Sequence, residues 1–175
     1  MTDRHARATF DRFAAMSLKR LYLEGRDVLK DDFRQLSLSG EEDVGQGPIS
    51  GISGFSRSRL ASLPAQAWRE RRAANLAAFC DALGEIDGLR LLETTFVATI
   101  VFDDGGRRDR ARASLVEYRI YPVVYWPLEE RVTPGIREVD IDLSRRVLSI
   151  HCDQRYSTDD MVRVARSFRR AVAAS

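Results

Sequence analysis

The feature that most constrains this chain is a glycine-rich decapeptide, GQGPISGISG, at residues 45–54. Glycine and proline disfavour both helix and strand, so no regular element is expected to continue through it. Ile49, Ile52 and Phe55 lie among or beside the glycines, which leaves two interpretations open, a plain linker and a packed loop of specific shape. Either way, we expect the chain to divide here.

Before this loop, the spacing of apolar residues predicts two helices. Positions 10–21 have helical spacing, and Gly25 lies where a left-handed C-terminal cap is expected. A second, shorter helix is predicted around residues 29–38 and should fray into the polar residues that follow. We expect residues 1–45 to form a helical segment that faces another domain or a partner, and residues 46–63 to form the glycine-rich loop and a short helix.

Residues 64–175 are predicted to form one two-layer α+β domain. The expected elements are a helix at 64–86, a strand at 95–102, a helix to about 118, strands at 120–125 and 147–152, and a last helix capped by Ser157. Pro122 lacks a backbone donor, so its strand should lie at an edge or carry a bulge. We expect the helices on one face of a small, mostly antiparallel sheet of about three strands.

Composition excludes several classes of function. The net charge is only +2, and the arginines alternate with acidic residues, so no nucleic-acid partner is predicted. No apolar run is long enough to span a membrane, and no signal-peptide pattern opens the sequence, so we expect a cytoplasmic protein. The arginine cluster at 107–112 is interpreted as a solvated helix face. Cys80 and Cys152 are expected to be reduced.

The residues form no familiar catalytic or metal-binding motif. The histidines, His5 and His151, and the two cysteines have no chelating spacing, so no metal site is predicted. His151 and Cys152 are neighbours on a predicted strand and should point to opposite faces, which makes a catalytic dyad unfavourable. No phosphate-binding loop or dinucleotide fingerprint is present.

A polar corner between the last strand and the last helix is the strongest candidate site. It contains His151, Asp153, Gln154 and Arg155. The planar fork of an arginine can hold a carboxylate through two hydrogen bonds. Alternatively, Arg155 pairs with Asp153, Asp159 or Asp160 as a structural brace. Composition alone leaves the two interpretations even.

Three stretches of the sequence together resemble a known family. They are ISGFSRSRLASLPAQAWRERRAANLAAF (52–79), VEYRIYPVVYWPLE (116–129) and LSRRVLSIHCDQRYSTDDMVRVARSFR (143–169). In this order they resemble the C-terminal half of DegT/DnrJ/EryC1/StrS-like aminotransferases, which are pyridoxal-phosphate (PLP) enzymes of fold type I. The likeness extends from about Ser17 to the last residue, and the third stretch is its most specific part.

In that family the cofactor lysine, the aspartate at the pyridine nitrogen and the aromatic residue stacked on the ring belong to the large domain. The lysines of this chain are Lys19 and Lys30, and neither matches the family position, so we assign no Schiff-base lysine and no catalytic residue. Without that lysine, the covalent anchor for PLP and the base that moves its proton are both missing. The resemblance therefore implies that this chain performs no PLP chemistry alone.

The resemblance suggests a substrate-binding role for four residues. Arg155 is expected to contact a substrate carboxylate, with Gln154 beside it. Tyr125 and Trp126 resemble the strand end that faces the active-site mouth.

A cofactor contact is also implied, for Ser53 and Ser56. Their loop resembles the stretch that, in family dimers, approaches the phosphate of the PLP held by the neighbouring subunit. The family pattern has an asparagine there, whereas this chain offers the two serines.

Two functions of different class follow from these residues. The first is a non-lysine subunit of a split PLP-dependent enzyme, whose lysine-bearing large domain is a separate chain that holds the PLP. The second is a non-catalytic interaction or regulatory protein that self-associates, as a homodimer, or binds an intact aminotransferase. The discriminating feature is the N-terminal helix, whose apolar residues Phe10, Phe13, Leu18 and Leu21 would form an exposed patch if left uncovered.

Overall fold

A computed structural model describes residues 3–46, 51–52, 54–92, 94–125, 128 and 135–174. The chain divides into two compact units, Met1–Ser62 (unit 1) and Leu63–Ser175 (unit 2). Unit 1 contains the helices α1 (Asp3–Leu23), α2 (Lys30–Gln46) and α3 (Gly54–Ala61). Unit 2 contains α4 (Ala65–Leu83), β1 (Leu89–Leu92), β2 (Val97–Phe102), α5 (Gly105–Glu117), α6 (Glu138–Arg146), β3 (Val147–His151) and α7 (Thr158–Ala173).

The first helix ends as its sequence predicts. Gly25 has a φ of 76°, and its N–H donates to the carbonyl of Tyr22 at 3.1 Å. The N–H of Arg26 donates to the carbonyl of Leu21 at 3.0 Å. Glycine adopts this left-handed conformation without a steric penalty, so it closes α1 by satisfying carbonyls that the helix leaves open.

The second helix is longer than predicted. It continues through the expected fraying point to Gln46, so it also includes Gly45, where the glycine-rich loop was expected to begin. Its close contact with α1 explains the difference, because a Cβ on Gly40 would lie 2.6 Å from Cγ of Arg12 and 3.0 Å from the carbonyl oxygen of Ala8. The missing side chain lets the two helices approach, and their packing outweighs the poor helix propensity of glycine.

Replacing each of two glycines of α2 by alanine, in separate variants, tests this close approach. Gly40→Ala should lower the free energy of unfolding by about 1–3 kcal/mol, because the added methyl overpacks the contact. Gly45→Ala is the control, since a Cβ there meets nothing within 4 Å. It should raise that free energy by up to ~1 kcal/mol through helix propensity. Urea unfolding followed by circular dichroism measures both, and equal effects would contradict the packing explanation.

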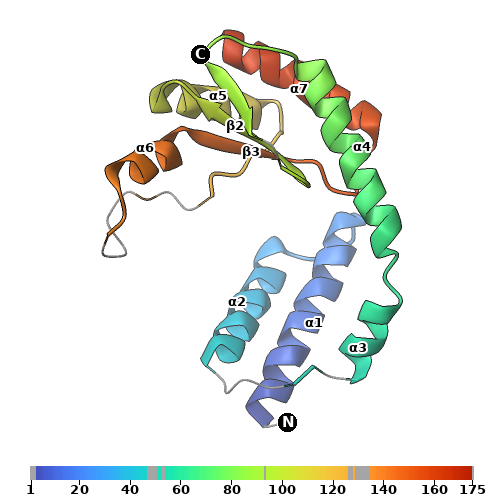
Figure 1. The fold of residues 1–175 in the computed structure, drawn as a ribbon. Helices are drawn as coiled ribbons and strands as arrows, with labels where there is room; N and C mark the ends of the chain where they lie inside the picture. The colour runs from blue at the N-terminus through green and yellow to red at the C-terminus, as the bar shows by residue number, and fades with distance from the viewer. Residues whose placement is uncertain are drawn as a thin grey trace. The chain divides into compact units, whose positions relative to one another are not determined.

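The core of unit 2 lies between one face of its sheet and the helices α4, α5 and α7 (Figure 1). The sheet is antiparallel with the order β1-β2-β3. Ile100 on the central strand pairs with Leu91 on one side and Leu148 on the other, so apolar side chains line up on the covered face. The predicted two-layer α+β architecture with three strands is confirmed.

One of the three strands is not the one predicted. Residues 120–125 form no strand, and only Val123 bridges to Ser149, through two hydrogen bonds of 2.8 and 2.9 Å. Beside this bridge, the ring of Pro122 fixes its φ at roughly −65°, away from the values of a regular strand. The third strand is β1, which follows a turn at Gly88 with a φ of 76°. Its four residues were too few to show an alternating pattern.

Three helical features of unit 2 also differ from the prediction. Helix α4 ends at Leu83 because Gly84 has a φ of 59°, although Ile86 still packs on the core. Helix α6 was not predicted, because its apolar residues Val139, Ile141 and Leu143 are spaced by two, which is the period of a strand. Arg108 on α5 is buried, so the arginine cluster is not wholly a solvated face.

No helix in the part of the chain that the structure describes could cross a membrane.

The last helix begins with the predicted cap. The Ser157 hydroxyl accepts from the Asp160 N–H at 3.1 Å, and the Ser157 N–H donates to the Asp160 carboxylate at 2.9 Å. This is a capping box, which satisfies two open N–H groups of the first turn. Below the cap, the predicted apolar face is buried at Met161, Ala165 and Phe168.

The cap predicts a pH-dependent stability. Hydrogen bonds from the Ser157 backbone and hydroxyl hold the pKa of Asp160 below its usual range. A depressed folded-state pKa adds stability above the unfolded-state pKa, and that contribution is lost as the pH falls through the folded value. Asp160→Asn should therefore lower Tm near neutral pH, with a difference from wild type that shrinks in acid. Thermal scans across this range test it. Asp159→Asn, outside the box, is the control, and a pH-independent Asp160→Asn effect would contradict the expectation.

Candidate functional site

The polar corner is built by the turn between β3 and α7. Asp153 accepts from the backbone N–H of Arg155 at 2.9 Å and from its Nε and Nη2 at 3.0 and 2.6 Å. This pairing holds the pKa of the Asp153 carboxyl below its usual range. The Arg155 guanidinium also lies 5.9 Å from the ring centroid of Tyr156. Of the aspartates considered as brace partners, Asp153 is therefore the one that pairs with Arg155.

Only one edge of the Arg155 guanidinium bonds to Asp153. Its bonds to that carboxylate use Nε and Nη2, which form one edge of the guanidinium plane. The edge formed by Nη1 and the second N–H of Nη2 takes no part in them, and the side chain is 71% exposed. A second carboxylate can be held there by two parallel hydrogen bonds. The geometry thus makes the two interpretations of Arg155 compatible.

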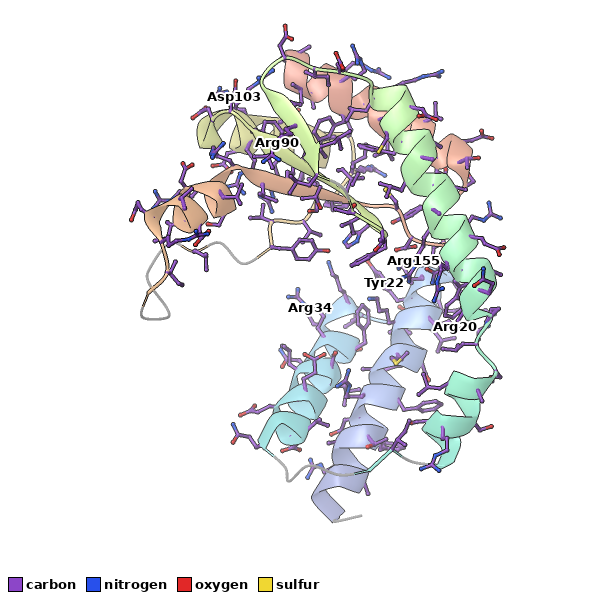
Figure 2. The ribbon with its side chains drawn as sticks, viewed as in Figure 1. Arg20, Tyr22, Arg34, Arg90, Asp103 and Arg155 are labelled. Carbon is purple, nitrogen blue, oxygen red and sulfur yellow. The ribbon has the colours of Figure 1, made fainter. Side chains whose placement is uncertain are left out.

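Helix α4 lies beside this corner, and two of its side chains form hydrogen bonds to it (Figure 2). The Asn75 amide donates to the carbonyls of Asp153 and Tyr156 at 2.8 and 3.0 Å, and the Nε of Arg72 donates to the Gln154 side chain at 2.8 Å. Neither Asn75 nor Arg72 was predicted. One signal was available, because Asn75 is a polar residue beside the apolar stripe of its helix.

A groove beside the corner was also missed. Its volume is about 800 Å³, and it lies between α4 and the turn that joins β1 to β2. Its larger lining side chains are Trp68, Arg69, Arg72, Leu76 and Phe96. Arg72 belongs both to this lining and to the corner through its bond to Gln154, so the groove and the corner adjoin.

Tyr125 lies apart from the corner. It lines a separate pocket of about 330 Å³ with Val147 and Ser149 of β3 and with residues of α6. Val147 is the first residue of β3, whereas Gln154 and Arg155 follow its last residue. The structure therefore brings Gln154 and Arg155 together and places Tyr125 toward the other end of the strand. Trp126 lies outside the described residues.

The described residues do not fit a covalent anchor for PLP. Lys19 is exposed on α1, and Lys30 is exposed at the first residue of α2. An exposed amine lacks the desolvation that can activate a Schiff-base lysine. Ser56 lies in the first turn of α3 and, like both lysines, belongs to unit 1. Ser53 lies outside the described residues.

The cysteines add no nucleophile. Burial raises the pKa of the Cys152 thiol to about 11, and burial also raises the pKa of Cys80. A thiolate is the reactive form of cysteine, so both are poor nucleophiles near neutral pH. Both are present as free thiols. Among the described residues, no cluster of three or more His, Cys, Asp or Glu side chains could hold a metal ion.

Comparison with known proteins identifies the fold. No family model and no curated protein matches the sequence. Among solved structures, the aminotransferase TlmJ from Streptoalloteichus hindustanus is 21% identical with a TM-score of 0.57, covering 69% of this chain and 35% of its own. DesV from S. venezuelae is 22% identical with a TM-score of 0.54, covering 67% of this chain and 35% of its own.

DesI, solved in the presence of its TDP-sugar product, is 20% identical with a TM-score of 0.55, and the match covers 81% of this chain and 42% of DesI. The chain thus spans a third to two fifths of the length of these structures. The resemblance predicted from the sequence is confirmed at the level of the fold: this chain folds like part of the DegT/DnrJ/EryC1/StrS-type aminotransferases.

Proposed function

We propose that this chain is the non-lysine subunit of a split PLP-dependent aminotransferase-like enzyme, and that a separately encoded lysine-bearing chain supplies the large domain. The observation that carries the proposal is the exposed edge of Arg155 in a corner braced by Asp153. The aminotransferase-type fold and the exposed positions of Lys19 and Lys30 support it.

The surface of unit 1 supports a partner. Its described buried residues are few and small apart from Phe33, so this unit has little core of its own. On α1, Phe10 and Phe13 are 68% and 60% exposed, and Leu21 is also exposed, whereas Leu18 is half-buried. The predicted apolar patch therefore exists without Leu18. Exposed apolar patches of this kind mark interaction sites, and a large domain would cover this one.

Each chain has a distinct role in this proposal. PLP, held by the partner's lysine, supplies the electron sink for chemistry at the substrate amine. On this chain, Arg155 binds and orients the substrate carboxylate, and Gln154 lies beside it with its side chain held by Arg72. Ser53 and Ser56 would approach the phosphate of the partner-held PLP, and Tyr125 and Trp126 would face the mouth of the joint site.

Co-expression tests the proposal directly. The pair should copurify, show a PLP absorbance band and turn over an amino-acid substrate, whereas each chain alone should be inactive. The control variant carries Lys19→Arg and Lys30→Arg and should retain full activity in the pair, because neither amine has a role. Two inert proteins that do not associate would overturn the split enzyme. So would PLP trapped by borohydride on Lys19 or Lys30.

Substrate class can be tested at Arg155 in the active pair. Arg155→Ala should raise KM for an amino acid by about tenfold to a hundredfold, because a hydrogen bond to a charged group contributes ~1.5–3 kcal/mol. Arg166→Ala is the control, since Arg166 is an exposed arginine on α7 outside the corner. An unchanged KM for the amino acid would reduce Arg155 to a structural brace.

The exposed face of α1 also favours a second function, a non-catalytic interaction or regulatory protein. In that case the apolar patch would bind a second copy of this chain or an intact aminotransferase. Native mass measurement distinguishes the two functions. A stable homodimer that does not bind the lysine-bearing chain, or a complex with a complete aminotransferase, would support the second function.

A further inference from the structure

Asn75 is an unusual residue in the core of unit 2. It is fully buried on α4, and its Oδ1 has no hydrogen-bond partner among the described residues. An unsatisfied buried polar atom costs about 1–3 kcal/mol. Leu76 and Phe79, its neighbours on α4, are apolar and pack in the core. The hydrogen bonds of its amide nitrogen must therefore explain why a polar side chain is buried at this position.

Those contacts fix both ends of the turn that carries Arg155. The Asn75 amide donates to the carbonyl of Asp153 at 2.8 Å and to the carbonyl of Tyr156 at 3.0 Å. The N–H of Tyr156 closes the same turn on the Asp153 carbonyl at 3.2 Å. One buried side chain thus determines where the backbone before and after Arg155 lies.

The side chain of Arg155 is positioned in a second step. The backbone that Asn75 holds also carries the Asp153 carboxylate, which takes the Nε and Nη2 edge of the guanidinium. With that edge fixed, the opposite edge has a defined direction. Arg72 adds a weaker constraint, because its bond to Gln154 reaches the side chain of that residue and not the backbone.

We propose that Asn75 is a positioning residue: through the two carbonyls that flank Arg155, it orients the exposed guanidinium edge that receives the substrate carboxylate. The substrate part of this inference rests on the proposed function. The positioning part concerns this chain alone. The two parts are therefore tested by separate measurements.

Hydrogen exchange of the full chain tests the positioning. In Asn75→Ala, the amides of Arg155 and Tyr156 should exchange at least about tenfold faster, whereas the amides in the middle of α7 should keep their protection. Leu83→Ala is the matched control, because it truncates a buried side chain at the far end of the same helix. It should show no selective effect at the corner.

Unchanged exchange at Arg155 and Tyr156 would overturn the inference whatever the enzyme does. Should Asn75→Ala fail to fold, Asn75→Ser retains one donor and gives the same comparison. It should accelerate exchange at Arg155 and Tyr156 and leave the middle of α7 protected.

A double-mutant cycle in the active pair tests the link to substrate. Asn75→Ala should raise KM for the amino acid severalfold and leave kcat near the wild-type value. In an Arg155→Ala background it should have no further effect on KM, because it acts through that residue. Additive effects, or a lower kcat with unchanged KM, would overturn the positioning role. An inactive pair would overturn the substrate part, while hydrogen exchange still decides the positioning.

Discussion

The packing of Phe168 joins the elements on which the rest of unit 2 depends. This buried side chain of α7 lies 6.2 Å, centroid to centroid, from Phe79 of α4 and from Phe102 of β2. The tilted and edge-to-face arrangements are those that aromatic pairs favour. Because α4 and α7 are held on the same face of the sheet, the turn that enters α7 lies within reach of polar groups on α4.

Much of the fold could be predicted from local patterns. The cap at Ser157 and the apolar face below it define α7, and Gly25 marks the end of α1. The errors arose where long-range contacts decide the structure. Helix α2 continues because Gly40 packs on α1, and residues 120–125 meet β3 only through the bridge of Val123 with Ser149. Neither outcome can be read from periodicity alone.

The candidate site shows the same division. Arg155 and Gln154 stood out because a strand ends in charged residues immediately before a helix cap. Asn75 and Arg72 did not, because their bonds reach residues about eighty positions further along the chain. The bonds of Asn75 go to backbone carbonyls, which every residue has. The side chains at the corner therefore do not indicate that these bonds exist. The separation of Tyr125 from the corner likewise follows from the direction in which its segment runs beside β3.

The uneven distribution of amines has a practical consequence. Both lysines lie in unit 1 and are exposed, while unit 2 carries only guanidinium groups as its basic side chains apart from the imidazole of His151. A cross-linker or dye directed at lysine side chains therefore attaches to α1 and α2 and leaves unit 2, with its sheet, unlabelled. Any complex mapped in this way would report the neighbours of α1 and α2, and the surroundings of Arg155 would need a guanidinium-directed or carboxylate-directed reagent.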